Sequence, residues 1–426
     1  MSLFSRSLIK TLGIYSFGNI INAAIPFFLL PFLTNYLTPN DYGIIAIFQV
    51  ILNFTNPISG ISINGAITRQ YYSIKDNRNL LGRYVTNALY ILIFFTSIAL
   101  IIFFVFGEKI SLYSGFPSNW LWVVLVCSFS HNMIEVLLSI WRVKLKAVNY
   151  VLFRFLRTII ELVLSILLIL YINKSWESRV EGQLYSSLFF AIFALFFLWK
   201  MKLFSFSFKV SKFDVKDILR FGIPLIPHAI GAVFITMADR IFITNMISIE
   251  ETGLYAVGFQ VSQIIALIQI SFNQAWVPFF YGKLKEESSS INLKLVKITY
   301  LYFGFLLILV LLLTFLSPYI YSIFIGEKFG SSIIYVFYIA LGFAFNGMYK
   351  MVVNYFFYLK KTKFIGIITI LTAGLNIVFN YALILEFGAI GCAYATTLSF
   401  FLQFIIVWYF SSKNYSMPWF FFLKQN

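Results

Sequence analysis

The stretch Asp239-Arg-Ile-Phe-Ile-Thr-Asn-Met-Ile-Ser-Ile-Glu-Glu-Thr-Gly-Leu-Tyr-Ala-Val-Gly-Phe-Gln-Val261 decides the fold, because a weaker copy of it lies near the N-terminus. Its segment 242–248, Phe-Ile-Thr-Asn-Met-Ile-Ser, matches segment 32–38, Phe-Leu-Thr-Asn-Tyr-Leu-Thr, at an offset of 210 residues. A separate pair, Gly182-x-x-Tyr-Ser-Ser and Gly391-x-x-Tyr-Ala-Thr, repeats at an offset of 209. Two matches at about half the length of a 426-residue chain predict two homologous halves.

The composition is that of an integral membrane protein. Hydrophobic residues make up 60% of the chain and charged residues 11%, with a mean hydropathy of +0.87. So few charges cannot cover the surface of a soluble protein of this size. We count twelve apolar runs near the length of about 20 residues that a bilayer requires. The sequence therefore predicts an all-α membrane protein with twelve transmembrane helices.

The twelve runs divide evenly between the halves. An even number per half means that both halves enter the membrane from the same side, which predicts two parallel six-helix repeats. We expect an N-terminal lobe at 1–205, a cytoplasmic linker at 206–220 and a C-terminal lobe at 221–426. The expected spans are 12–33, 43–67, 84–106, 119–141, 148–171, 183–199, 222–247, 253–280, 297–316, 332–358, 364–385 and 389–410.

The distribution of basic residues predicts the orientation. The chain has 32 Lys and Arg, and 24 of them fall in the two tails and the even-numbered loops. Because cytoplasmic loops are rich in Lys and Arg, we expect both termini in the cytoplasm. The net charge of +16 then marks orientation and attraction to anionic membrane lipid, not a nucleic-acid partner.

Six prolines fall inside expected spans, and they occupy corresponding helices of the two halves. Proline removes a backbone donor and bends a helix, so paired positions are candidate hinges around a central site. Proline is also commoner in membrane helices than in soluble ones, which is the alternative explanation. The candidate hinge residues are Pro26, Pro31, Pro57, Pro224, Pro227 and Pro278.

Charged side chains within spans are costly in lipid and mark candidate functional positions. His131 and Glu135 share one face of the fourth span, and Arg154, Arg157 and Glu161 share a face of the fifth. At 1.5 Å per residue, Glu135 and Arg154 each lie about 9 Å from the cytoplasmic ends of their spans. In an antiparallel hairpin these two side chains can meet, and Arg157 is a second candidate partner for Glu135.

Three further charges lie in the C-terminal half. Lys350 lies at a depth similar to that of Arg154 and Arg157, so these three could form a cationic collar in a central cavity. The alternative is that Arg154 and Lys350 extend to the interface while Glu161 neutralises Arg157. Asp239 and Arg240 are sequence neighbours on different helix faces, so we expect one to face the cavity and the other a neighbouring helix. A gate, a ligand of a coupling ion and a structural pair all remain open for them.

The sequence lacks the motifs of several kinds of enzyme and metal site. The chain has no G-x-x-x-x-G-K-[ST] phosphate loop, so we expect no ATP hydrolysis. Two His and two Cys residues give no metal centre and no nucleophile triad. We therefore expect a secondary transporter that is not an enzyme and has no cofactor apart from a coupling ion, H⁺ or Na⁺.

The chain resembles the polysaccharide transporter family of the multidrug/oligosaccharidyl-lipid/polysaccharide exporter superfamily. The resemblance is carried by Asp239-Arg240 before Gly-Leu-Tyr at 253–255 and by two late stretches, Gly-Leu-Asn-Ile-Val-Phe-Asn at 374–380 and Gly-Ala-Ile-Gly-Cys-Ala-Tyr-Ala-Thr-Thr at 388–397. It is similar to the Wzx-type flippases of O-antigen or capsule synthesis. The resemblance implies transfer of an undecaprenyl-diphosphate-linked oligosaccharide from the cytoplasmic to the periplasmic leaflet by alternating access. Other membrane proteins of polysaccharide assembly are further candidate partners.

The coupling ion is a separate question. Some lipid II flippases of this superfamily have a sodium site, and the resemblance places Asp239, Asn376, Asn380 and Thr396 at its positions, with Asn380 where the pattern has an acid. The two asparagines could instead join helices to each other. Proton coupling through Glu135, Glu161 or His131 is the competing hypothesis.

The balance of charges within the spans favours an anionic substrate. Four basic residues, Arg154, Arg157, Arg240 and Lys350, stand against three acidic ones, Glu135, Glu161 and Asp239. Guanidinium groups bind diphosphates through charge-assisted hydrogen bonds. Two alternatives stay open, a cation-coupled multidrug antiporter of the same fold and a membrane glycan polymerase or ligase.

Overall fold

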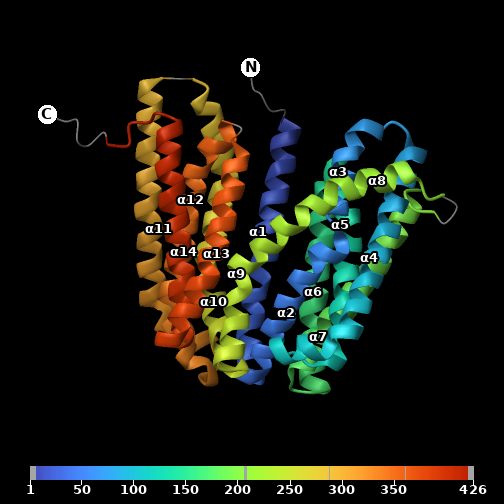
Figure 1. Cartoon of the computed structure of the whole chain (residues 1–426), viewed down its shortest axis with the longest axis horizontal. Coiled ribbons are helices and arrows are strands. Elements are labelled where there is room, and N and C mark those ends of the chain that lie inside the picture. Colours follow the sequence, from blue (N-terminus) through green and yellow to red (C-terminus); the bar gives the residue numbers. More distant parts are fainter. Residues whose placement is uncertain (1–5, 206–208, 287, 360, 421–426) are drawn as a thin grey trace. The chain divides into compact units, whose positions relative to one another are not determined.

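The computed structural model describes residues 6–205, 209–286, 288–359 and 361–420, and this part of the chain is helical without a strand (Figure 1). Its first half contains α1 (Arg6–Tyr36), α2 (Pro39–Gly60), α3 (Ile63–Ile74), α4 (Arg78–Ser114), α5 (Leu121–Val143), α6 (Ala147–Tyr171) and α7 (Trp176–Lys200). The second half contains α8 (Lys212–Gly222), α9 (Ile226–Met246), α10 (Ile249–Leu284), α11 (Ser289–Phe324), α12 (Ile333–Tyr358), α13 (Thr362–Phe387) and α14 (Ala389–Asn414). Short 3₁₀ turns precede α5, α9 and α12.

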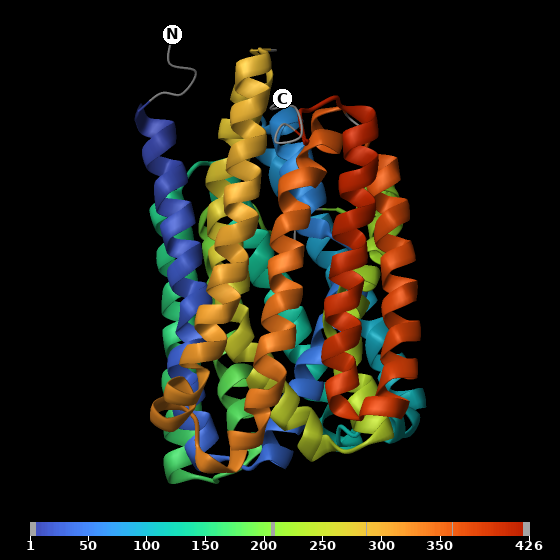
Figure 2. The same ribbon diagram turned by 90° about the vertical axis from the view of Figure 1, so that its left-hand side faces the viewer.

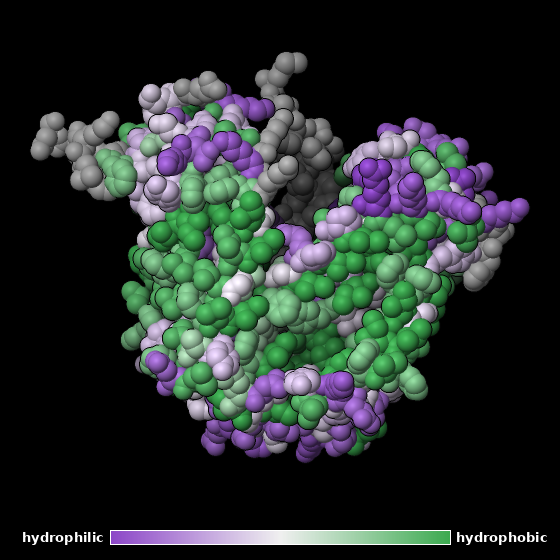
Figure 3. Space-filling model, viewed as in Figure 1, coloured by the Kyte–Doolittle hydropathy of each residue, from purple (hydrophilic) through white to green (hydrophobic). Residues whose placement is uncertain are grey.

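The long helices correspond to the twelve expected spans, with α2 and α3 together forming the second. Within the described residues, 10 helical segments are long and apolar enough to cross a membrane. The helix α6 is not one of them, because Arg154, Arg157 and Glu161 interrupt its apolar sequence. In the part of α1 whose side chains the structure describes, Ala24–Tyr36 is a shorter apolar stretch. The middle of each helical bundle is covered by apolar residues, and hydrophilic residues gather at its ends (Figure 3).

The chain forms two compact units, Met1–Val233 and Phe234–Asn426. This boundary lies inside α9 and differs from the expected lobes at 1–205 and 221–426. The expected linker at 206–220 differs too, because α8 buries Asp214, Ile218 and Gly222 and packs against α3 and α4 of the first unit. Residues 206–208 of that linker lie outside the described residues.

Corresponding helices pair in the same way within each unit. The helix α7 packs against α5 and α6 in the first unit. In the second unit α14 packs likewise against α12 and α13, which stand with it at the front of Figure 2. Likewise α2 packs against α5, and α10 packs against α12. Two homologous halves are expected to pack their corresponding helices in this same way.

The repeated segments 32–38 and 242–248 form equivalent turns. Each ends one long helix and caps the next, because the Thr38 hydroxyl accepts a hydrogen bond from the Asp41 amide at 3.2 Å and the Ser248 hydroxyl accepts one from the Glu251 amide at 3.0 Å. A hydroxyl at the N-cap with an acid three residues later stabilises a helix start. The sequence match therefore reflects one structural element used in both units.

Two of the proline sites lie at helix interruptions. Just after Pro57, the chain breaks between α2 and α3 at Ile61 and Ser62, whose φ angles are +41° and +48°. A positive φ is strained for a β-branched residue. A second break, around Pro224 and Pro227, lies between α8 and α9, and Gly222 packs there against Ile61. In contrast, α1 continues through Pro26 and Pro31, and α10 continues through Pro278.

Candidate functional site

The intramembrane charges of the first unit lie together on α5 and α6. His131 is within electrostatic reach of Glu135 on its own helix and of Arg154 and Arg157 on α6. The spacing of these residues places them on the facing sides of an antiparallel hairpin, as the sequence predicts. These four side chains therefore lie near one another within the apolar bundle, and their role in transport stays a prediction.

The two acids of this region have partners other than those expected. Glu161 pairs with Arg179 of α7, at 2.9 Å between Oε1 and Nη2, and Arg179 also donates to the Ser165 hydroxyl at 3.0 Å. Glu135 lies 3.8 Å from Arg142 on its own helix. These acids thus have arginine partners that the sequence did not suggest, while a meeting of Glu135 with Arg154 stays a prediction.

Arg179 is the residue of this site that the sequence analysis missed. It lies one turn inside α7 with a largely buried side chain. Its position three residues before the repeated segment that begins at Gly182 was the available signal. Because Glu161 pairs with Arg179, no ion pair joins Arg157 to an acid of the described residues.

Arg154 is held against an aromatic ring. Its Nη1 donates to the Tyr150 hydroxyl at 3.1 Å, and its guanidinium lies 5.6 Å from the centre of the same ring. The guanidinium of Arg142, on α5, lies 5.5 Å from the centre of the same Tyr150 ring. Two cations at one ring keep positive charge at this end of the cluster.

Arg157 is the unneutralised cation of the cluster. Its Nε is buried without a hydrogen-bond partner, and no carboxylate of the described residues pairs with its guanidinium. The side chain as a whole is partly exposed, so its Nη atoms are open to a ligand. A guanidinium in this state is a site for an anion, because pairing with a phosphate would satisfy both its charge and its donors.

In the second unit, Asp239 and Arg240 pair with each other. Arg240 Nη1 lies 2.8 Å from Asp239 Oδ1 and also donates to the Thr236 carbonyl at 3.1 Å, while its guanidinium lies 4.1 Å from the centre of the Phe259 ring. Both residues are buried, at 3% and 6% exposure. The structure thus shows the structural pair that the sequence left open, because the flexible arginine side chain folds back onto its neighbour.

Breaking this pair is expected to destabilise the protein. Asp239→Asn and Arg240→Gln each leave one buried charge without its partner, which costs roughly 3 kcal/mol. Each single variant should unfold at a lower temperature than wild type in detergent, and the double variant should recover part of the loss. Equal midpoints for wild type and both single variants would contradict a buried, mutually dependent pair.

Tyr255 and Cys392 complete the surroundings of Asp239. Both lie within electrostatic reach of its carboxylate. The buried Tyr255 hydroxyl lies beside Asp239 without a hydrogen bond of regular geometry. The sequence placed Gly253-Leu-Tyr in the resemblance but gave no role to this tyrosine.

Of the two asparagines of α13, Asn376 bonds to α14 and Asn380 bonds to Asn376 within α13. Asn376 Nδ2 donates to the Ser399 hydroxyl of α14 at 3.2 Å, and Asn380 Nδ2 donates to Asn376 Oδ1 at 3.0 Å. Thr396 is buried on the same helix as Ser399. Asn380 Oδ1 is buried without a partner, but a sodium ion at Asp239 would lie beside the Arg240 guanidinium. This donor set does not fit the sodium site that the resemblance implies.

Lys350 of α12 is partly buried, and its amine has no carboxylate partner among the described residues. Its backbone carbonyl accepts a hydrogen bond from Asn354 at 2.8 Å. Because Lys350 belongs to the second unit and the two arginines to the first, the cationic collar stays a prediction.

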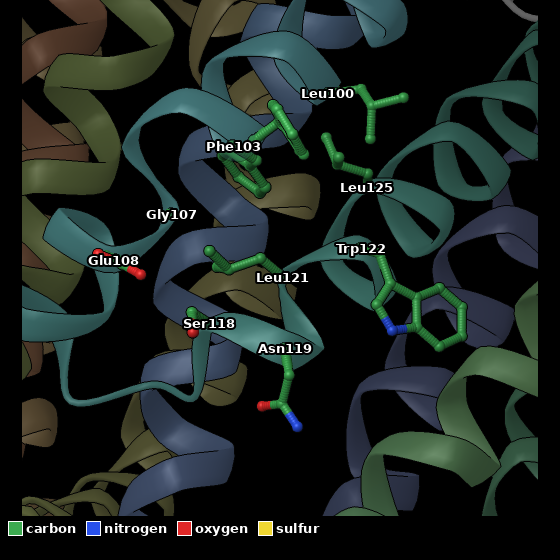
Figure 4. A pocket seen from close by; sticks show the side chains of 10 residues that line it. Leu100, Phe103, Gly107, Glu108, Ser118, Asn119, Leu121, Trp122 and Leu125 are labelled. Carbon is green, nitrogen blue, oxygen red and sulfur yellow. The ribbon is translucent and has the colours of Figure 1, made fainter.

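A groove of about 310 Å³ lies elsewhere on the first unit, between α4 and α5 (Figure 4). Leu100, Phe103, Leu121, Trp122 and Leu125 line it, with Glu108, Ser118 and Asn119 at one end. None of the charged residues of the α5–α6 cluster lines this groove. Its apolar lining suits a lipid chain and not the polar part of a substrate.

Comparison with known proteins gives two kinds of similarity. The chain is 29% identical to an uncharacterized membrane protein of Haemophilus influenzae over 86% of this chain and 88% of that protein. It is 28% identical to the Lsg locus putative protein 1 of the same organism, over 87% and 89%. The matched region covers most of each relative's own length.

Two solved structures share the fold. The inward-facing conformation of a multidrug resistance MATE family transporter of the MOP superfamily has a TM-score of 0.75 at 14% identity, over 93% of this chain and 94% of that one. The lipid II flippase MurJ, in an inward closed conformation, has the same TM-score at 15% identity, over 94% and 87%. Both confirm the predicted fold class.

The sequence also matches the profile of the family described as "Polysaccharide biosynthesis protein" over residues 8–282. That region covers more than half of the chain, from the first turn of α1 through α9, and includes the ion pairs Glu135–Arg142, Glu161–Arg179 and Asp239–Arg240. The chain belongs to this polysaccharide biosynthesis protein family.

Proposed function

We propose that this chain is a flippase that moves an undecaprenyl-diphosphate-linked oligosaccharide, an O-antigen or capsule repeat unit, from the cytoplasmic to the periplasmic leaflet. Membership of a polysaccharide biosynthesis family supports a substrate of this class. The shared fold with a lipid II flippase supports transport of a lipid-linked sugar without an enzymatic step. In this proposal the protein is a multi-pass protein of the inner membrane with both termini in the cytoplasm.

The observation that carries the proposal is the unpaired Arg157. In the α5–α6 cluster and its contact with α7, Arg142, Arg154, Arg157 and Arg179 stand against Glu135 and Glu161, and each acid already has an arginine partner, Arg142 for Glu135 and Arg179 for Glu161. A drug exporter for cations needs the opposite balance. A diphosphate supplies the anionic oxygens that Arg157 lacks, in charge-assisted hydrogen bonds that Arg makes in two-pronged form.

The mechanism we infer keeps the lipid tail in the bilayer while the sugar and diphosphate cross a polar cavity. Arg157 and its neighbours hold the diphosphate, and the cavity opens to each side of the membrane in turn. The strained break at Ile61 and Ser62 and the break at Pro224 are the places where helices can change direction. Other proteins of polysaccharide assembly would supply and receive the substrate.

Coupling to an ion gradient is part of the proposal. His131, Glu135 and Glu161 lie in or next to the cluster that holds Arg157, so protonation there would change the charge that the diphosphate meets. Sodium is the second possibility, but the pairing of Asp239 with Arg240 argues against Asp239 as its ligand. Proton coupling is therefore the form we propose.

The test is the surface glycan of a strain that lacks this chain, resolved by length on a gel. A flippase predicts loss of all glycan built on the lipid-linked unit, accumulation of that unit inside the cell, and recovery with the wild-type gene. Glycan reduced to single repeat units would indicate a polymerase instead. An unchanged ladder, in a strain without a second flippase, would overturn the proposal in favour of a drug antiporter.

A further inference from the structure

The helix α8 has two chemically distinct faces. Its basic residues, Lys212, Lys216 and Arg220, recur every four positions and so form one row along the helix. Its acids, Asp214 and Asp217, lie on the opposite side. The Ser211 hydroxyl caps the helix by accepting from the Asp214 amide at 3.3 Å, which fixes where the pattern begins.

The acidic face of α8 is fully engaged within the first unit. Asp214 Oδ2 accepts from Arg83 Nε at 2.8 Å and from Asn87 Nδ2 at 3.3 Å. Asp217 pairs with Arg69 and accepts from the Tyr84 hydroxyl at 2.7 Å. These contacts, with the fully buried Ile218, hold α8 against α3 and α4.

The basic face is left without partners. Lys212, Lys216 and Arg220 are exposed, and none has an ion pair with any described residue. They line a groove of about 620 Å³ together with Val215, Leu219, Ile223 and Pro224. A row of positive charges thus runs beside a row of apolar side chains, at the end of the first unit where hydrophilic residues gather (Figure 3).

The position of α8 puts this face at the membrane boundary. Its partners Arg83 and Tyr84 lie in the second turn of α4, just after the polar loop that ends at Asn77. At its other end, α8 leads through a 3₁₀ turn into α9, which begins the next span. Phe213, 74% exposed on the edge of the basic row, adds an apolar side chain at the same level.

We propose that the basic face of α8 binds the headgroup of an anionic phospholipid, with Lys212, Lys216 and Arg220 around the phosphate and an acyl chain along Val215, Leu219 and Ile223. Amphipathic helices with basic and apolar rows bind anionic membrane surfaces in this way. The charge complementarity is specific to this face, because every acid of α8 is bound on the other side. This inference does not depend on the transported substrate.

The test compares two triple variants of the purified full-length protein in detergent. The α8 variant is Lys212→Gln, Lys216→Gln, Arg220→Gln. The matched control, Lys285→Gln, Lys294→Gln, Lys413→Gln, removes the same charge at exposed positions of the second unit. The unfolding temperature is measured during titration with phosphatidylglycerol and, separately, with phosphatidylcholine and with inorganic phosphate.

We expect phosphatidylglycerol to raise the unfolding temperature of the wild type and of the control by similar amounts, in a manner that salt weakens. The α8 variant should need at least a fivefold higher phosphatidylglycerol concentration to reach half of the rise in unfolding temperature. An α8 variant that responds like wild type would overturn the proposal. An equal rise with phosphatidylcholine, or with inorganic phosphate alone, would also overturn it, because the site would then not select an anionic lipid.

Discussion

Replacing Arg157 with glutamine is expected to lower the rate of flipping by about 10- to 100-fold. The change removes a charged donor that no other group of the described cluster can replace, since Arg154 is held at Tyr150 and Arg179 at Glu161. A hydrogen bond to a charged group contributes about 1.5–3 kcal/mol, which corresponds to that range of rates. Arg157→Lys keeps the charge without the two-pronged geometry, so its flipping rate should lie between those of the wild type and of Arg157→Gln.

The measurement is the amount of surface glycan in the deletion strain, with each variant present at the level of the wild-type protein. Lys294→Gln is the control, because it removes one exposed positive charge of α11 far from any span charge in sequence. Full glycan with Arg157→Gln would show that the unpaired guanidinium does not serve the substrate. Loss with Lys294→Gln as well would point to total charge instead of position.

The second large effect is expected from the two glycines of the repeat. A Cβ at Gly182 would lie 2.4 Å from the Ser165 hydroxyl and 2.7 Å from its backbone nitrogen, and a Cβ at Gly391 would lie 2.2 Å from the Leu383 carbonyl oxygen. Each glycine thus lets its helix, α7 or α14, lie directly on the helix before it. Gly182→Ala and Gly391→Ala must move a backbone, at a cost of about 3 kcal/mol.

Gly374→Ala in α13 is the matched control, since a Cβ there meets no atom within 4 Å. Alanine is the better helix former, so this variant should be unchanged or more stable by up to about 1 kcal/mol. The thermal midpoint of each purified variant in detergent gives the comparison. If Gly182→Ala and Gly391→Ala have the same thermal midpoint as the control Gly374→Ala, the helix contacts at Gly182 and Gly391 are looser than described.

The sequence predicted the elements that depend on local chemistry. Long apolar runs predict spans because lipid offers backbone groups no partner. The matches at Thr38 and Gly182 predicted two homologous halves, and both units contain the same capped turn and the same close helix contact at these positions. The clustering of His131, Glu135, Arg154 and Arg157 followed from helical spacing alone. These features need no knowledge of how distant helices pack.

The errors concern contacts that depend on packing and on side-chain reach. Glu161 and Arg179 are 18 residues apart, and only the pairing of α6 with α7 brings them together. Arg240 folds back along its own helix, which a rule based on helix faces does not anticipate. The helix α8, which begins within the expected linker, is a further feature that depends on packing, because Asp214 and Asp217 supply the contacts that hold it in place.

The most direct test of the central claim is reconstitution of the purified chain into vesicles with an undecaprenyl-diphosphate-linked oligosaccharide in both leaflets. An enzyme that modifies the sugar is added outside, and the modified fraction is followed with time. The account predicts that modification continues beyond the outer-leaflet pool with wild-type protein and stops at that pool with Arg157→Gln. Wild-type vesicles that stop at the same level as protein-free vesicles, with an ion gradient of either H⁺ or Na⁺ imposed, would contradict it.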